Sequence, residues 1–373
     1  MLKLLRHTFL SASILTLAGC GVGDPTVPSG DGDVDVQGSC ALDERYLSLG
    51  AAAKDGIPAI DEPFWVAADD SLELSYLSDA DRVVGFLVQG QPYAVPINIL
   101  WYHEIVNASF TTSLGPLDLA VTHCPLTGTS IVFDRAAVGG AEFGVSGILY
   151  QSNLVMYDRR TEESLWPQMI GASRCGPASG TELLLHRSIE MRWDGWVSLY
   201  PDTEVLAVPG GNRGGYDTNP YAGYDAPYAE YTFSMPPLDG RLPPKARVLG
   251  VHSGGGLTWV FPFSELGARG DFAALDRSFG APATASVVLW DKQRAAAAAY
   301  RSEVGGLVLS FRATADGIYD VETGSRWTVD GLAVEGSLAG ERLEPAGRSY
   351  VSFWGVWAAF FTFPQIWGQR GPG

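Results

Sequence analysis

Basic residues are scarce in this 373-residue sequence, which has 25 Lys and Arg against 42 Asp and Glu. The formal net charge is −17. A surface with this excess of negative charge repels phosphate groups, so nucleic acids and anionic lipid headgroups are excluded as expected partners.

Long apolar runs are also few, and the one at the amino terminus is too short to span a bilayer. Lys3 and Arg6 precede the apolar run 9–17, and small residues follow it. This order is typical of an export signal covering residues 1–19. The string Leu17-Ala18-Gly19-Cys20 matches a lipoprotein box, so we expect Cys20 to be lipidated and to anchor the protein to a membrane of the cell envelope, facing the periplasm or the exterior.

Removal of the signal takes two basic and no acidic residues, which leaves a net charge of 23 − 42 = −19. Residues 20–45 begin with the lipidated Cys20 and are mostly Gly, Asp, Pro, Val and Ser, a composition that predicts a flexible tether. Roughly 330 residues remain, which suffices for two packed domains.

Amphipathic helical periods are scarce in the remaining chain, and short apolar runs separated by Gly, Pro and Asp dominate it. This pattern predicts a mainly β protein with few short helices. The uncharged segment 349–367 is nearly long enough for a transmembrane helix. Because its counterpart in the repeat described next carries charged residues, we expect a buried element instead.

Two parts of the chain match each other in four blocks that occur in the same order. They predict an internal duplication, with two tandem β-rich units packed together. The matched blocks are 90–100 with 255–266, 131–140 with 298–306, 156–166 with 318–327, and 193–200 with 354–361. We call residues 83–208 the first half, 247–369 the second half, and the Gly-, Tyr- and Pro-rich stretch 209–246 the connector. The run 295–299 of five alanines would favour a helix by propensity, but its partner block favours turn and strand, and we follow the partner.

A duplicated scaffold needs its core residues twice but a reactive site only once. His103 and Glu104 follow the matched block 90–100 of the first half, whereas the segment directly after the matching block 255–266 contains no His or Glu. His123 and Cys124 likewise align with Trp290 and Asp291. These four residues, Cys124, His123, His103 and Glu104, are therefore the candidate catalytic residues.

Their chemistry allows more than one role. Cys124 can act as a thiolate nucleophile, the imidazoles can activate it, and Glu104 can orient an imidazole. Cys124, His123 and His103 can instead bind a metal, with copper or iron as candidates. The string His-Cys-Pro-x-x-Gly differs from a Rieske iron–sulfur loop, because Leu126 stands where that loop needs a second His.

Cys124 also has structural interpretations, as a small buried apolar residue or as half of a disulfide. With Cys20 lipidated, the chain has three other cysteines, Cys40, Cys124 and Cys175. In an oxidising compartment at most two of the three can pair within the chain.

The same residues are similar to those of a bacterial family called domain of unknown function family 3179. The matching strings are 93–107, 124–129, 143–159 and 338–343, and the resemblance covers most of residues 80–368. Some members are named as selenoproteins, which implies a redox role for the reactive position, here Cys124. Thr127 stands where members commonly carry a second Cys, so a pair of thiols is absent from this loop, and Tyr102 replaces a common Trp.

The leading hypothesis is an extracytoplasmic redox protein that uses Cys124 as a thiolate, together with an envelope protein or small molecule as redox partner. The alternative is a non-catalytic binding or structural lipoprotein. In that case five tyrosines of the connector would offer a rigid contact surface, unless they form a packed link between domains. These are Tyr216, Tyr221, Tyr224, Tyr228 and Tyr231.

Overall fold

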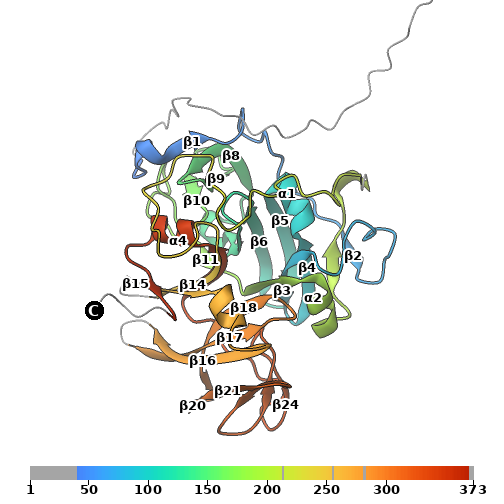
Figure 1. Ribbon diagram of the computed structural model, residues 1–373. Helices are drawn as coiled ribbons and strands as arrows, with labels where there is room; N and C mark the ends of the chain where they lie inside the picture. Colours follow the sequence, from blue (N-terminus) through green and yellow to red (C-terminus); the bar gives the residue numbers. More distant parts are fainter. Residues whose placement is uncertain (1–39, 212–213, 254–255, 280–282, 369–373) are drawn as a thin grey trace, which may run out of the picture.

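A computed structural model describes residues 40–211, 214–253, 256–279 and 283–368 (Figure 1). The predicted export signal, Cys20 and most of the predicted tether lie outside these residues. The described chain is mainly β with few short helices, which confirms the expected fold class. No helix in the described ranges is long and apolar enough to cross a bilayer.

The folded body begins earlier than we expected. Cys40 forms a disulfide with Cys175, and Leu42 is buried, so residues 40–45 belong to the folded body and not to the predicted tether. Cys124 is the free cysteine of the described chain. This first segment contains η1 (Glu44–Tyr46), β1 (Leu47–Leu49) and β2 (Trp65–Ala67).

The first half begins with a hairpin, a short helix and a three-stranded ladder, and ends with a strand and a helix. Its elements are β3 (Arg82–Val88), β4 (Gln91–Pro96), α1 (Ile97–His103), β5 (Ile105–Thr112), β6 (Gly115–Cys124), β7 (Thr129–Asp134), η2 (Arg135–Val138), β8 (Phe143–Tyr150), β9 (Asn153–Asp158), β10 (Leu165–Pro167), β11 (Leu184–Leu185), β12 (Ser188–Arg192), α2 (Trp193–Leu199) and β13 (Glu204–Leu206). The connector follows, starting with η3 (Pro209–Gly211).

The second half repeats this order. Its elements are β14 (Arg247–Ser253), β15 (Leu257–Pro262), α3 (Phe263–Gly267), β16 (Phe272–Phe279), β17 (Thr284–Asp291), β18 (Ala296–Arg301), β19 (Glu303–Val304), β20 (Leu307–Val308), β21 (Phe311–Thr314), β22 (Gly317–Asp320), β23 (Arg326–Trp327), β24 (Ala333–Glu335), β25 (Arg348–Phe353), α4 (Trp354–Phe360) and β26 (Gln365–Ile366). Residues 296–299 of the alanine run lie in strand β18 and Ala295 lies in the turn before it, as the partner block predicted. The uncharged segment 349–367 forms β25, α4 and β26.

The sheets of the two halves have the same strand order. The first half contains the order β12-β3-β4-β13 and the second contains β25-β14-β15-β26. β13 and β26 each run parallel to their neighbours β4 and β15, while the other pairs are antiparallel. The first sheet is extended by β2, which pairs antiparallel with β13. Pro96 and Pro262 both precede the first helix of their half, with φ of −63° and ψ of 133° and 134°.

Two pairs of aromatic contacts also correspond. Trp166 donates its indole N–H to Asp158 at 2.8 Å, and Trp327 donates to Asp320 at 2.9 Å. Trp196 lies over Gly85 and Trp357 lies over Gly250, so closely that a Cβ at either glycine would stand 2.4 or 2.0 Å from the ring.

The halves interlock by sharing two hydrophobic clusters. One cluster joins Met156 and Trp166 of the first half with Trp354 and Trp357 of the second. A second cluster joins Trp196 with residues of β17, β18, β22 and β23. Each half also has a cluster of its own. Figure 1 shows the result, in which α4 lies beside the sheets of the first half while β16 to β24 form the lower body.

Candidate functional site

The turn between β6 and β7 carries Cys124 and is held from outside by the second half. The backbone N–H of Phe353 donates to the Thr127 carbonyl at 3.0 Å, and Ser352 Oγ donates to the same oxygen at 3.2 Å. Thr129 Oγ1 in turn donates to Ser352 Oγ at 2.9 Å. Gly128 sits at φ +60°, and a Cβ there would meet the ring of Phe353 at 2.8 Å. The turn is therefore rigid.

Cys124 is fully buried at the end of β6. Its thiol donates weakly to the Ser152 carbonyl, at 3.8 Å. Burial, with the nearby charge of Glu104, raises the pKa of this thiol to about 12, although hydrogen bonds from Thr127 and Leu154 act in the opposite direction. Burial thus favours the neutral thiol over the thiolate, because a buried site disfavours the charged form.

Glu104 lies at the end of α1 and is the most unusual acidic residue of the site. Its side chain is 4% exposed, and burial raises its carboxyl pKa to about 8. Its backbone has φ +56° and ψ −31°, a region that residues other than glycine rarely adopt. Within the part of the chain that the structure describes, the carboxyl has no hydrogen-bond or ionic partner. Strained backbone and an unpaired buried acid are both typical of functional sites.

A cavity of about 210 Å³ opens beside this carboxyl. Three segments form its walls: the early segment that contains Gly56 and Ile57, strand β8, and the connector at Tyr221. The remaining lining is mainly apolar and includes Leu126, Leu154 and Phe233. A mostly apolar cavity with one converging polar group is the usual form of a small-molecule site.

Cys124 stands behind one wall of this cavity. Its neighbours Leu126 and Leu154 line the space, and Tyr221 is within electrostatic range of both Cys124 and Glu104. The structure therefore brings together two of the four predicted residues, Glu104 and Cys124.

His103 does not face the thiol. Its Nδ1–H donates to the Pro58 carbonyl at 2.8 Å, so Nε2 accepts from the Tyr216 hydroxyl, also at 2.8 Å. Burial lowers the pKa of His103 below its usual value. This imidazole joins the early segment to the connector, which are two of the walls of the Glu104 cavity.

His123 also points away from the thiol, because neighbouring residues of a strand face opposite sides of the sheet. Its Nδ1–H donates to Ser130 Oγ at 2.9 Å, and Ser130 donates to Glu190 at 2.8 Å. Burial lowers the pKa of His123 to about 3. The imidazole is neutral and belongs to a separate network.

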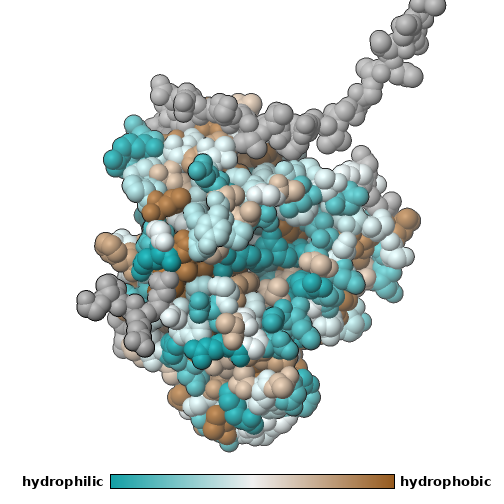
Figure 2. Space-filling view, in the orientation of Figure 1, coloured by the Kyte–Doolittle hydropathy of each residue, from teal (hydrophilic) through white to brown (hydrophobic). Residues whose placement is uncertain are grey.

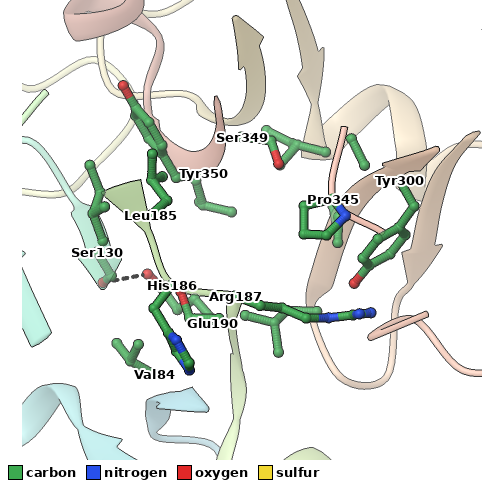
Figure 3. A pocket seen from close by; sticks show the side chains of 18 of the residues that line it. Val84, Ser130, Leu185, His186, Arg187, Glu190, Tyr300, Pro345, Ser349 and Tyr350 are labelled. Atoms are coloured by element: carbon green, nitrogen blue, oxygen red, sulfur yellow. Dashed lines mark hydrogen bonds between the residues drawn. The ribbon is translucent and has the colours of Figure 1, made fainter. Parts of the chain in front are cut away.

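Glu190 is the centre of that network, between the two halves. Arg82 and Arg247 each donate to it at 2.6 Å. Although burial would raise the pKa of Glu190, the two guanidinium charges lower it to about 2. Figure 3 shows Ser130 bonded to Glu190 at one side of a cavity of about 110 Å³, with Tyr300 of the second half across from them.

The predicted metal site is not assembled. No three His, Cys, Asp or Glu side chains lie close enough together to hold a metal ion in the ranges that the structure describes. The set Cys124, His123 and His103 is divided among three environments, so these residues do not form a joint site for copper or iron.

The connector covers the site, as Figure 1 shows where its trace passes in front of the first half. Tyr224 donates to the Leu126 carbonyl at 3.2 Å, and Tyr231 donates to Pro244 at 3.1 Å. The amine of Lys245 donates to the carbonyls of Tyr224 and Glu230 at 2.6 and 2.8 Å. Tyr228 is the exposed member of the five tyrosines, at 81%. The connector is a packed cover, which agrees with the second interpretation given for it above.

Hydrophobic residues are scattered over the face shown in Figure 2, and hydrophilic residues form a band across the middle of this face. That face offers no single large apolar patch of the kind that marks many protein-binding surfaces.

Several site residues were not found from the sequence. Gly56 and Ile57 lie before the repeats, and Phe233 lies in the connector, so a comparison of the two halves could not single them out. Ser130 was available to that comparison, because it stands opposite His123 in the ladder and Ala297 stands opposite Trp290.

Comparison with known proteins identifies a family. Residues 54–365 match the model of a family described as protein of unknown function (DUF3179). Neither the curated proteins nor the solved structures contain a match.

Proposed function

Because this chain belongs to the DUF3179 family, whose description names no activity, we propose a function from the geometry of the site. The protein is an extracytoplasmic, lipid-anchored protein whose first half binds a small molecule beside Glu104, with uptake or release of a proton at this carboxyl. One observation carries this proposal: a carboxyl group without a partner, 4% exposed, that lines a cavity of about 210 Å³.

The raised pKa of Glu104 suits that role. An acid with a pKa of about 8 has both protonation states available near neutral pH, which is what general acid–base chemistry requires. The thiol of Cys124 lies behind the wall that Leu126 and Leu154 form. Because this thiol is neutral, it adds no charge to that side of the cavity.

A redox role for Cys124 is the second candidate. The hydrogen bonds from Thr127 and Leu154 support it, since donors to sulfur stabilise a thiolate. Against it stand the complete burial of the thiol and the absence of a second cysteine at Thr127. A redox role predicts that Cys124→Ser abolishes the activity of the protein and that Glu104→Gln retains this activity. The proton-transfer role predicts that Glu104→Gln abolishes the activity.

The two halves derive, in this proposal, from an internal duplication. The shared element order, the shared sheet order and the corresponding Trp–Gly and Trp–Asp contacts support it. The site residues were retained in one half only.

The lipid anchor and the envelope location rest on the sequence of residues 1–20. The Cys40–Cys175 disulfide supports them, because disulfides persist in oxidising compartments. In cell fractionation, the wild type should stay with membranes, and Cys20→Ser should lose lipid processing. Wild-type protein recovered free of membranes would contradict the anchor.

The binding role can be tested by ligand-induced stabilisation. The full-length chain is mixed with the small-molecule fraction of a bacterial envelope extract, and its thermal unfolding is recorded. We expect stabilisation of the wild type that is lost in Glu104→Gln and in the cavity-filling variant Leu126→Phe. Leu114→Phe is the matched control, because Leu114 is 94% exposed. Equal behaviour of all four proteins would refute the role of the cavity.

A further inference from the structure

The Glu104 cavity has a charge arrangement that narrows the class of its ligand. Glu104 is the one acidic or basic residue among those that line the cavity. Loss of solvent is the cause of its raised pKa, with no Lys or Arg contributing among the described residues. Buried carboxylates in folded proteins are paired with cations, so this one lacks the partner that would stabilise its charge.

The remaining walls suit the apolar body of a ligand. Two aromatic side chains, Tyr221 and Phe233, and the aliphatic side chains of Leu126, Leu149 and Leu154 line the space. Aromatic faces attract cations through the ring quadrupole. A protein with a net charge of −17 also draws positive ligands towards itself.

We propose that the cavity binds an organic ammonium ion with a compact apolar body, whose positive charge pairs with the carboxylate of Glu104. This inference rests on the proposed role of the Glu104 cavity and adds the charge and shape of its ligand.

The binding step has a defined proton balance. Below pH 8 the free carboxyl is mainly protonated. The ammonium ligand keeps its own protons, so its binding as an ion pair releases the carboxyl proton to the buffer. Cys124 and Tyr221 are the ionisable groups within electrostatic range of Glu104, and burial keeps both neutral at this pH. A neutral ligand leaves the carboxyl protonated and releases no proton.

The test is calorimetric titration of the full-length chain in nonionic detergent micelles, with protein-free micelles as blank. The probes are benzylamine, as its ammonium ion, and benzyl alcohol, which has a similar size and no charge. Titrations at about pH 6.5, below the Glu104 pKa of about 8, are run in two buffers with different ionisation enthalpies.

We expect benzylamine to bind with release of nearly one proton. Glu104→Gln should weaken its binding by about tenfold or more and remove the proton release. Benzyl alcohol should bind more weakly than benzylamine, without proton release and with little change in Glu104→Gln. Glu62→Gln is the matched control and should behave as the wild type.

The outcomes separate this inference from the proposed function. If benzyl alcohol binds as tightly as benzylamine, or benzylamine binds without proton release, the ammonium class is wrong while the cavity remains a binding site. If neither probe binds at millimolar concentration, and Leu126→Phe leaves the thermal stabilisation by the envelope extract unchanged, both the inference and the proposed binding role fail.

Discussion

The turn of residues 124–129 in the first half and the turn of residues 291–296 in the second occupy corresponding places but differ in chemistry. Each closes a ladder, β6–β7 or β17–β18, and each is held by a backbone hydrogen bond from the other half. Phe353 donates to Thr127 and Arg192 donates to Arg294, both at 3.0 Å. The two turns are thus held by the same kind of backbone contact.

The side chains differ where the ladders match. Asp291, in the place of Cys124, binds Arg294 of its own turn at 2.6 Å. Ala273 pairs with Trp290, in the place where Glu104 accepts a hydrogen bond from the backbone of His123. The second turn satisfies its own charge, and the first leaves a carboxyl and a thiol without ionic partners. Unpaired polar groups on an otherwise equivalent scaffold are the mark of a site.

The largest expected effect concerns Cys124, the residue that most separates the two turns. With a pKa of about 12 instead of about 8.5, its thiolate fraction near neutral pH is lower by about three orders of magnitude, and burial slows access further. Iodoacetamide should therefore label native protein at least about a thousandfold more slowly than unfolded protein, as followed by mass spectrometry. Rapid labelling below neutral pH would restore the thiolate hypothesis.

The next effect concerns Glu190, where the halves differ again, because the ladder places Val351 at the matching position. Glu190→Gln leaves Arg82 and Arg247 close together without a counter-charge, so we expect a loss of about 3 kcal/mol or more in chemical denaturation. Asp194→Asn is the control, since its ion pair with Arg192 is partly exposed and should contribute less than about 1 kcal/mol. A loss as small as the control's would show that the halves do not depend on this network.

Glu104 should make stability depend on pH. Its pKa is about 8 in the folded protein and 4.5 as a free side chain, so the folded state binds more protons between these values. Stability should therefore fall as pH rises from about 4.5 to 8, by at most about 1.4 kcal/mol per pH unit from this group. Glu104→Gln should remove that slope in denaturation curves recorded across the range. A slope unchanged in the variant would mean that Glu104 is ionised in the folded protein.

The smallest effects test how closely the two halves correspond. Gly85→Ala and Gly250→Ala each push a Cβ into a buried Trp ring, so each should destabilise the protein by about 1–3 kcal/mol. Gly240→Ala is the control, because its Cβ would meet nothing within 4 Å. If one of the two is as neutral as the control in thermal unfolding, the two Trp–Gly contacts are not equivalent.

Much of the fold followed from local pattern and from the comparison of the halves. The alanine run 295–299 shows why that comparison helps, since strand pairing overrode its helical propensity in β18. The cores that the two halves share could not be predicted from the sequence. A sequence pattern shows which residues are buried, but it does not show which half covers them. Phe353 thus looks like a core residue of its own half, yet its ring packs against Gly128 of the first.

The site was predictable in part. The halves singled out Glu104 and Cys124, and the structure brings these two together. The opposite orientation of His123 and Cys124 follows from their adjacency once a strand is assumed, so their separation could have been predicted. The contact of His103 with Pro58 and Tyr216 could not, because both partners lie outside the repeated blocks.

The most direct test of the proposed site is the titration of Glu104 itself, followed by infrared spectroscopy. The C=O stretch of a protonated, buried carboxyl is recorded across neutral pH as the difference between the wild type and Glu104→Gln. The account predicts a protonated band that disappears with an apparent pKa of about 8 and is absent from the variant. A carboxyl already ionised at about pH 6, well below that value, would contradict it.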